Sequence, residues 1–132
     1  MIRAILGLGS GPLVTSLSSA TEYSRCPFTL GIASGDVRDD SAVLWTRLAP
    51  EPLQADGGMS PVSVPVQWEL ALDPAMSRIV RRGQAIATPE LAHSVHVELE
   101  GLEPDREYWY RFSVPSHSSR TGRTKTLPDR NS

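Results

Sequence analysis

Two histidines are the residues whose type and spacing come nearest to a metal site. His93 and His96 stand three residues apart. That spacing puts two side chains on one face of a helix but on opposite faces of a strand. The alternating stretch 94–99 (Ser-Val-His-Val-Glu-Leu) predicts a strand. We therefore expect ordinary edge or inter-domain histidines rather than joint metal ligands.

An acidic turn is the second candidate for metal chemistry. Asp36, Asp39 and Asp40 lie between the first two expected strands. Carboxylates separated by one or two residues can bind calcium, but this set lacks the glycine and the distal glutamate of a dedicated calcium loop. Aspartate is also a residue that turns prefer. The sequence favours a solvated turn over a calcium site.

Other catalytic patterns are absent from the sequence. It contains no Gly-x-Ser-x-Gly nucleophile elbow, and Gly7-x-Gly9-x-Gly11 precedes no strand–helix pattern of a phosphate loop. His117 lies among serines with no evident partner. Cys26 is the single cysteine, which excludes an intrachain disulfide and a cysteine-based zinc cluster, so we expect a free thiol. The sequence thus predicts no catalytic, cofactor-binding or metal-binding residue in this chain.

Length and composition limit the classes of protein to consider. The chain has 132 residues, 39% hydrophobic and 21% charged, which fits one globular domain. Its formal net charge of −2 leaves no basic surplus to bind a nucleic-acid backbone. No run approaches about 20 apolar residues, so we expect no transmembrane segment.

The elements that must position these residues are short strands. The clearest is 62–72, where every even position is apolar and one face should be buried. Pro65 lacks an N–H and should lie where the strand has no partner on one side. Further strands are expected near 30–32, 43–45, 78–87, 94–99 and 107–112. About seven short strands separated by turn residues predict an all-β, two-sheet antiparallel sandwich.

The most specific local pattern precedes the last of these strands. Leu102, Pro104 and Tyr108 have the spacing of a tyrosine corner, in which the phenol bonds a backbone group upstream. The pattern resembles the fibronectin type III (immunoglobulin-like) domain, with Trp45 in the place of that fold's buried strand tryptophan. Trp109 should point outward, either as part of a docking surface or as ordinary cross-strand packing.

A longer resemblance covers about residues 27 to 127. The stretches 27–36 (PFTLGIASGD) and 41–50 (SAVLWTRLAP) resemble the opening of the PhoD-like alkaline phosphatase family. The resemblance continues in order through 57–59, 64–69, 81–83, 88–97 and 122–126. It implies an N-terminal fibronectin-like domain that precedes a calcineurin-like metallophosphatase domain. The latter domain would bind iron and calcium and hydrolyse phosphate mono- and diesters, and some members carry the name phospholipase D.

The resemblance also sets expectations for domains, activity and location. We expect a tail or degenerate signal peptide at 1–26, the fibronectin-like domain at 27–127, and at 128–132 the start of a linker to a catalytic domain that this chain lacks. The family's metal ligands have no matching position here, so the chain alone should be inactive. Its expected partner is the metallophosphatase domain, in cis or as a split chain.

The N-terminal residues and the exposed aromatic residues bear on location and on an alternative function. The family implies export to the periplasm, cell envelope or medium, yet residues 1–20 contain one arginine and no twin-arginine pair, since Arg81-Arg82 falls in a strand region. The alternative function is a free-standing fibronectin-like extracellular module that binds a polymer or a cell-surface partner. Two or more exposed aromatic rings on one sheet would favour that alternative.

Overall fold

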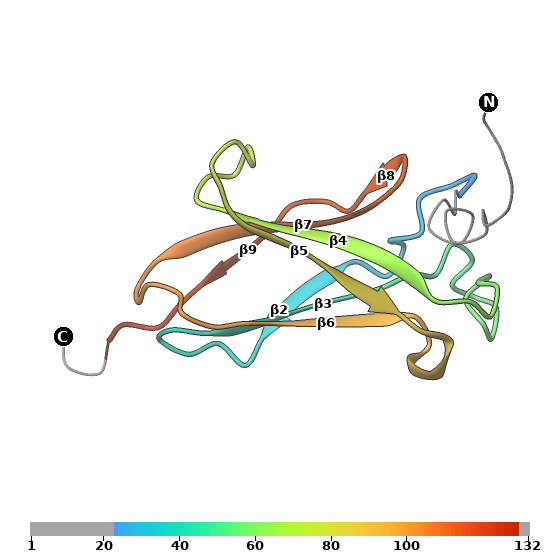
Figure 1. The fold of residues 1–132 in the computed structure, drawn as a ribbon, viewed down its shortest axis with the longest axis horizontal. Coiled ribbons are helices and arrows are strands. Elements are labelled where there is room, and N and C mark those ends of the chain that lie inside the picture. The colour runs from blue at the N-terminus through green and yellow to red at the C-terminus, as the bar shows by residue number, and fades with distance from the viewer. Residues whose placement is uncertain (1–22, 130–132) are drawn as a thin grey trace, which may run out of the picture.

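The computed structural model describes residues 23–129, which form a β-sandwich of two antiparallel sheets (Figure 1). The smaller sheet has the order β2-β3-β6, with β2 at Ile32–Gly35, β3 at Ala42–Arg47 and β6 at Ser94–Leu99. The larger has the order β5-β4-β7-β8, and β9 also pairs with β7. Its strands are β5 (Ile79–Ala87), β4 (Val64–Ala71), β7 (Glu107–Val114), β8 (His117–Ser118) and β9 (Gly122–Lys125). The expected all-β sandwich is confirmed.

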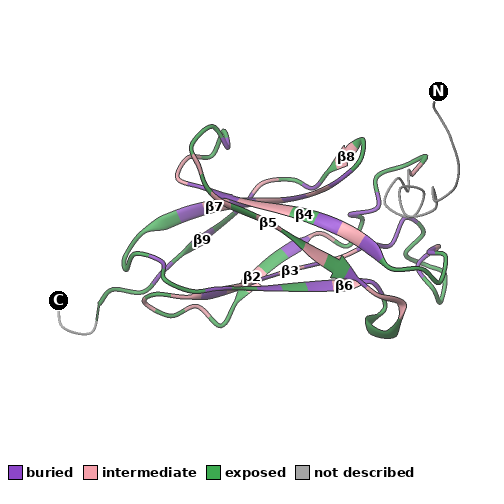
Figure 2. Cartoon of the chain, viewed as in Figure 1, coloured by how far each residue is buried: buried purple, intermediate pink, exposed green. Residues whose placement is uncertain are grey.

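The core follows from side-chain alternation along the strands. On β7 the buried residues are Tyr108, Tyr110, Phe112 and Val114, and the positions between them face outward. The rings of Tyr110 and Phe112 pack edge to face with centroids 6.3 Å apart. Burying a side chain such as Phe112 contributes about 1.5–3 kcal/mol. Figure 2 shows this alternation of buried and exposed positions on the strands of both sheets.

Strand β4 shows why two unusual residues lie where they do. Pro65 pairs with Ile86 of β5, while the pairing of β4 with β7 begins only at Gln67. Pro65 therefore has no ladder partner on its β7 side, as the sequence predicts. Three residues after Pro65, Trp68 covers Gly83 of β5, where an added Cβ would lie 2.6 Å from the indole ring. Only glycine fits under that ring.

Trp45 does not take the buried position that the resemblance predicts. The even-numbered residues of β3 face the core, and Leu44 is fully buried there. Trp45 therefore points to the outer face of the smaller sheet, where it is half-buried. It lies between Ala33 of β2 and His96 of β6 in the strand register. The prediction of a buried Trp45 is wrong because strand parity assigns the core position to its neighbour.

The described part of the chain begins at one end of the sandwich and finishes at the other. The chain enters near Tyr23, whose carbonyl accepts a 2.8 Å hydrogen bond from His117. We call this the entry end, and it contains 23–31 together with the loops 48–63 and 88–93, the second of which holds the 3₁₀ turn η1 (Pro89–Leu91). The exit end contains the loops 36–41, 72–78 and 100–106 and the segment 126–129. The two ends lie far apart in Figure 1.

Residues 1–22, where most of the signal-like tail is expected, lie outside the described residues. Tyr23, at the start of the described chain, packs partly buried against the core. Within residues 23–129, no helix is long and apolar enough to cross a membrane.

Candidate inter-domain interface at the exit end

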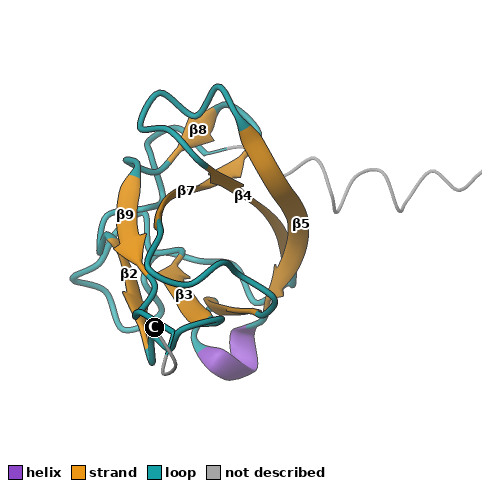
Figure 3. Cartoon of the chain, turned by 90° about the vertical axis from the view of Figure 1, so that its left-hand side faces the viewer, coloured by secondary structure: helices purple, strands orange, loops and turns teal. Residues whose placement is uncertain are grey.

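The segment that follows β9 is bonded to loops on both sides of the exit end. The Leu127 N–H donates to the Arg38 carbonyl in the β2–β3 loop at 3.0 Å. The Leu127 carbonyl accepts from the Asp105 N–H in the β6–β7 loop at 2.9 Å. Figure 3 looks at the molecule from this end, with the C-terminal segment toward the viewer. The two bonds fix the place and direction in which the chain leaves the sandwich.

Thr126 is the side chain at the centre of this arrangement. It is 1% exposed, and its hydroxyl donates to the Glu103 carbonyl at 2.6 Å and accepts from the Arg106 N–H at 3.0 Å. Its own N–H donates to the Arg106 carbonyl at 3.0 Å. Removing the hydroxyl would take the acceptor from the Arg106 N–H and the donor from the Glu103 carbonyl, at a cost of about 0.5–1.5 kcal/mol per hydrogen bond. The sequence analysis missed this residue.

The tyrosine corner holds the same loop from the other side. The Glu103 N–H donates to the Tyr108 hydroxyl at 2.9 Å, which confirms the predicted corner. Leu102 is buried beneath it, and its N–H donates to the Asp40 carbonyl at 2.8 Å. The peptide groups on both sides of Glu103 are thus fixed, one by Tyr108 and one by Thr126. We call the set Arg38, Glu103, Asp105, Arg106, Tyr108, Thr126 and Leu127 the exit clamp.

The surface around the exit clamp is acidic with one apolar side chain beside it. A groove of about 500 Å³ runs between the β2–β3 loop and the end of β6, and four of its lining residues are carboxylates: Asp36, Asp40, Glu98 and Glu100. A second hollow of about 350 Å³ is lined by Arg38, Asp39, Leu127 and Pro128. Leu127 is 53% exposed. The end therefore offers negative charge and an aliphatic contact to a partner surface.

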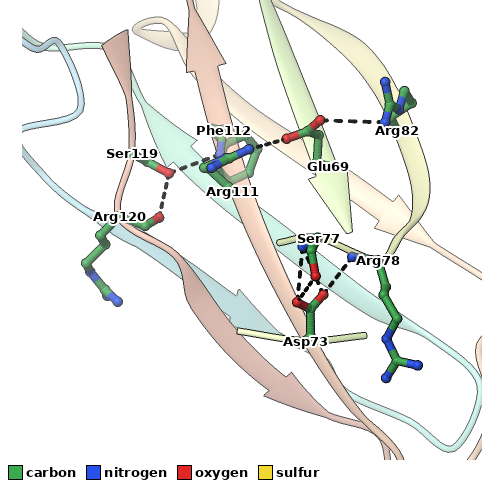
Figure 4. Close-up of polar contacts among 9 residues, drawn as sticks. All are labelled: Glu69, Asp73, Ser77, Arg78, Arg82, Arg111, Phe112, Ser119 and Arg120. Carbon is green, nitrogen blue, oxygen red and sulfur yellow. Dashed lines mark hydrogen bonds and ion pairs between the residues drawn. The ribbon is translucent and has the colours of Figure 1, made fainter. Parts of the chain in front are cut away.

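The β4–β5 loop closes the exit end on the larger sheet. The Asp73 carboxylate accepts hydrogen bonds from the Ser77 hydroxyl, the Arg78 N–H at 2.8 Å and the Ser77 N–H at 3.0 Å (Figure 4). These bonds, the Ser77 hydroxyl first, hold the pKa of Asp73 below its ordinary value. A single exposed carboxylate thus organises the whole turn.

The structure does not bring the two candidate histidines together. His93 is buried at the entry end, with its Nε2 2.8 Å from the Val62 carbonyl oxygen, whereas His96 lies on the exposed face of β6. The aspartates at 36, 39 and 40 lie in the β2–β3 loop, where Asp36 is 3.8 Å from Arg38. Across residues 23–129, no group of three or more histidine, cysteine, aspartate or glutamate side chains could hold a metal ion.

On the outer face of the larger sheet, the side chains of neighbouring strands contact one another. Glu69 lies 2.7 Å from the Arg111 guanidinium and 4.0 Å from that of Arg82 (Figure 4). Trp109 points outward, as predicted, and stands opposite Ala71, which is fully buried although it also faces outward. This favours cross-strand packing for Trp109. Trp45 lies on the other sheet, so these two rings form no strip on one face.

The fold defines the class of protein first. The fibronectin type III domain of the human KIAA0970 protein is similar, with a TM-score of 0.55 and 11% identity over 91% of this chain and 87% of that one. The sensor domain of the anti-sigma factor RsgI4 of Pseudobacteroides cellulosolvens is similar at a TM-score of 0.53 and 13% identity, over 75% and 93% of the two chains. These likenesses establish a fibronectin-like sandwich and nothing of its function.

Closer relatives identify the family. The family "PhoD-like phosphatase, N-terminal domain" matches residues 14–128. Alkaline phosphatase D of Bacillus subtilis (strain 168) is 55% identical over 112 residues, which are 85% of this chain and 19% of that protein. A solved structure of PhoD superposes with a TM-score of 0.80 at 56% identity, over 83% of this chain and 21% of that one. The chain belongs to the PhoD-like phosphatase family as its N-terminal domain, and it spans about a fifth of the length of these relatives.

Proposed function

We propose that this domain packs against the metallophosphatase domain of a PhoD-like alkaline phosphatase and orients it. The observation that carries the proposal is the exit clamp, in which Leu127 is hydrogen-bonded to Arg38 and to Asp105. Domains joined by a loose linker move relative to each other by default. A chain that leaves from a fixed point in a fixed direction loses less freedom when the next domain packs.

The proposed activity of the whole protein is hydrolysis of phosphate mono- and diesters outside the cytoplasm. An alkaline phosphatase D relative at 55% identity supports the hydrolase class. We assign the iron and calcium of the family to the metallophosphatase domain, because the residues described in this chain do not fit them. His93 is engaged with the Val62 carbonyl, and the carboxylates of the exit end have no histidine or cysteine among them. We assign no catalytic step to this domain.

A domain exchange tests the orienting role. Residues 14–128 of this chain replace the corresponding N-terminal domain of the Bacillus subtilis alkaline phosphatase D, with Thr126 intact or as Thr126→Val. The intact graft should hydrolyse a chromogenic phosphate ester, and the Thr126→Val graft should show kcat/KM lowered several-fold because the exit direction is no longer fixed. Thr88→Val is the matched control, because the Thr88 side chain makes no capping hydrogen bond at η1.

Two results would contradict the proposal. One is equal kcat/KM for the intact and Thr126→Val grafts at equal folded fraction, which would remove the role of the exit clamp. The other comes from the isolated chain, which we expect to be inactive when assayed with iron and calcium. If that chain released phosphate at an enzymatic rate until a chelator was added, the accessory role would be wrong.

A further inference from the structure

A small apolar hollow opens at the exit end between the start of β5 and the tyrosine corner. Its apolar lining residues are Leu72, Val80, Leu102 and Tyr108. Leu102 and Tyr108 are buried, whereas Leu72 is half-buried and Val80 is 47% exposed. The hollow has a volume of about 170 Å³, which is below the roughly 300–1,000 Å³ of small-molecule pockets. It is therefore sized for a side chain rather than for a small ligand.

A β-bulge brings Val80 to the rim of this hollow. The pairing of β5 with β4 shifts between Leu70 and Ala71, which leaves Val80 as an extra residue without a partner on β4. A bulge bends its strand and changes the direction of a side chain. Arg81, the next residue, pairs with the buried Leu70, and its guanidinium donates to the Gly101 carbonyl at 3.1 Å. An aliphatic side chain and a cation thus lie side by side at the rim.

The charged groups around the hollow are mostly positive. Arg81 and Arg106 line it together with one carboxylate, that of Glu103. Among the ion pairs within residues 23–129, none includes either of these two guanidinium groups. The hollow therefore differs from the acidic groove at the same end of the sandwich and would attract a carboxylate.

The hollow lies beside the point where the chain leaves the sandwich. The Thr126 hydroxyl donates to the Glu103 carbonyl at 2.6 Å and accepts from the Arg106 N–H at 3.0 Å, so it holds two of the lining residues. The matched family is an N-terminal domain, and this chain spans about a fifth of its relatives. Most of such a protein therefore follows Leu127 and begins next to the hollow.

We propose that this hollow receives an aliphatic or aromatic side chain of the metallophosphatase domain that follows, with a carboxylate beside it that pairs with Arg106. The inference rests on the proposed function and adds to it the surface through which the two domains meet. Apolar side chains in desolvated pockets are the usual anchors of an interface, and charges around them set its orientation. Such an anchor would cover Val80 most, because the other apolar lining residues are already buried or half-buried.

Alkylation by iodoacetamide tests whether Val80 is covered. Val80→Cys is made in a Cys26→Ser background, because Cys26 is exposed, in this chain alone and in the Bacillus subtilis graft described above. Position 80 should react at least about tenfold more slowly in the graft, because a covered thiol reacts only when the interface opens. Ile86→Cys is the matched control, since Ile86 lies on the same strand near the entry end, is 50% exposed and should react equally in both. Mass spectrometry of peptides reads each cysteine separately.

Arg106→Gln tests the charged part of the site. It removes the guanidinium but keeps the backbone groups that Thr126 bonds, and in the graft it should raise the alkylation rate of Val80→Cys several-fold. Arg82→Gln is the matched control, because Arg82 lies on the outer face beside Glu69 and should leave that rate unchanged. Circular dichroism checks that each variant is folded.

Three results would overturn the inference. One is equal alkylation of Val80→Cys in the chain and in the graft, and another is equal slowing of Val80→Cys and Ile86→Cys in the graft. The third, an unchanged rate after Arg106→Gln, would overturn the pairing with a carboxylate. Each of them leaves the proposed function standing where Thr126→Val still lowers kcat/KM of the graft, so the two failures are distinguishable.

Discussion

The two ends of the sandwich are held together by different chemistry. At the exit end, the hydroxyls of Thr126 and Tyr108 bond the backbone of one loop, and the last segment of the chain bridges two loops. At the entry end, a buried imidazole links two loops instead, because His93 Nε2 lies 2.8 Å from the Val62 carbonyl oxygen. The exit end is rich in carboxylates, whereas the entry end exposes aliphatic side chains such as Leu53 and Leu91.

The contacts at the entry end stabilise the domain itself, whereas those at the exit end also set the direction toward the next domain. The entry end closes on itself, because its loops bond one another and the start of the described chain. The exit end is completed only by residues that follow the last strand, so its geometry is tied to the direction of the chain beyond Leu127. Substitutions at the entry end should therefore cost stability, while substitutions in the exit clamp should cost stability and orientation together.

The largest effect is expected at the entry end, from His93→Ala. It removes a buried ring and leaves the Val62 carbonyl without its donor, so the free energy of unfolding should fall by about 2–3 kcal/mol. Urea unfolding measures the change. His96→Ala is the control, because His96 is exposed on β6 and should change stability by less than about 0.5 kcal/mol. Equal effects of the two variants would contradict the contrast between the ends.

A smaller effect is expected at the tyrosine corner. Tyr108→Phe keeps the buried ring and removes one acceptor from the Glu103 N–H, so it should cost about 0.5–1.5 kcal/mol. Thermal unfolding measures this loss, and amide exchange at Glu103 should quicken in the variant. A melting curve identical to that of the unmodified chain would count against the corner as a support of the exit clamp.

The smallest effect is expected in the β4–β5 loop and depends on pH. The folded state lowers the pKa of Asp73 from its ordinary 3.8, so its contribution is present above that value. The contribution is lost as pH falls through the lower, folded-state pKa. The Ser77 amide shift should report this titration, and Asp73→Asn should abolish it while the sandwich stays folded. A titration of that amide at or above the ordinary carboxyl pKa would contradict the assignment.

Alternation along the strands predicts most of the fold. Val95, Val97 and Leu99 on β6 are buried as the period of two requires, and the corner at Tyr108 follows from its spacing to Leu102. The resemblance misplaced Trp45, because a motif position says less about which face a side chain takes than the parity of its strand does.

The candidate site was harder to predict than the fold. Thr126 is a polar residue after the last strand, and its burial depends on Glu103, 23 positions away. His93 is buried because it reaches Val62, 31 positions away, and was expected only as an edge or inter-domain histidine. Gly83 is required by the indole of Trp68. Each of these roles comes from a contact between segments distant in sequence, which periodicity does not encode.

Hydrogen exchange at the Leu127 amide tests the exit clamp most directly. The account predicts that this amide, bonded to the Arg38 carbonyl, exchanges about 100-fold or more slowly than in an unstructured peptide. It also predicts that Thr126→Val speeds this exchange, while amides of the core strands stay protected. Exchange of the Leu127 amide at the rate of an unstructured peptide would show that the chain leaves the sandwich without a fixed direction, and would contradict the account.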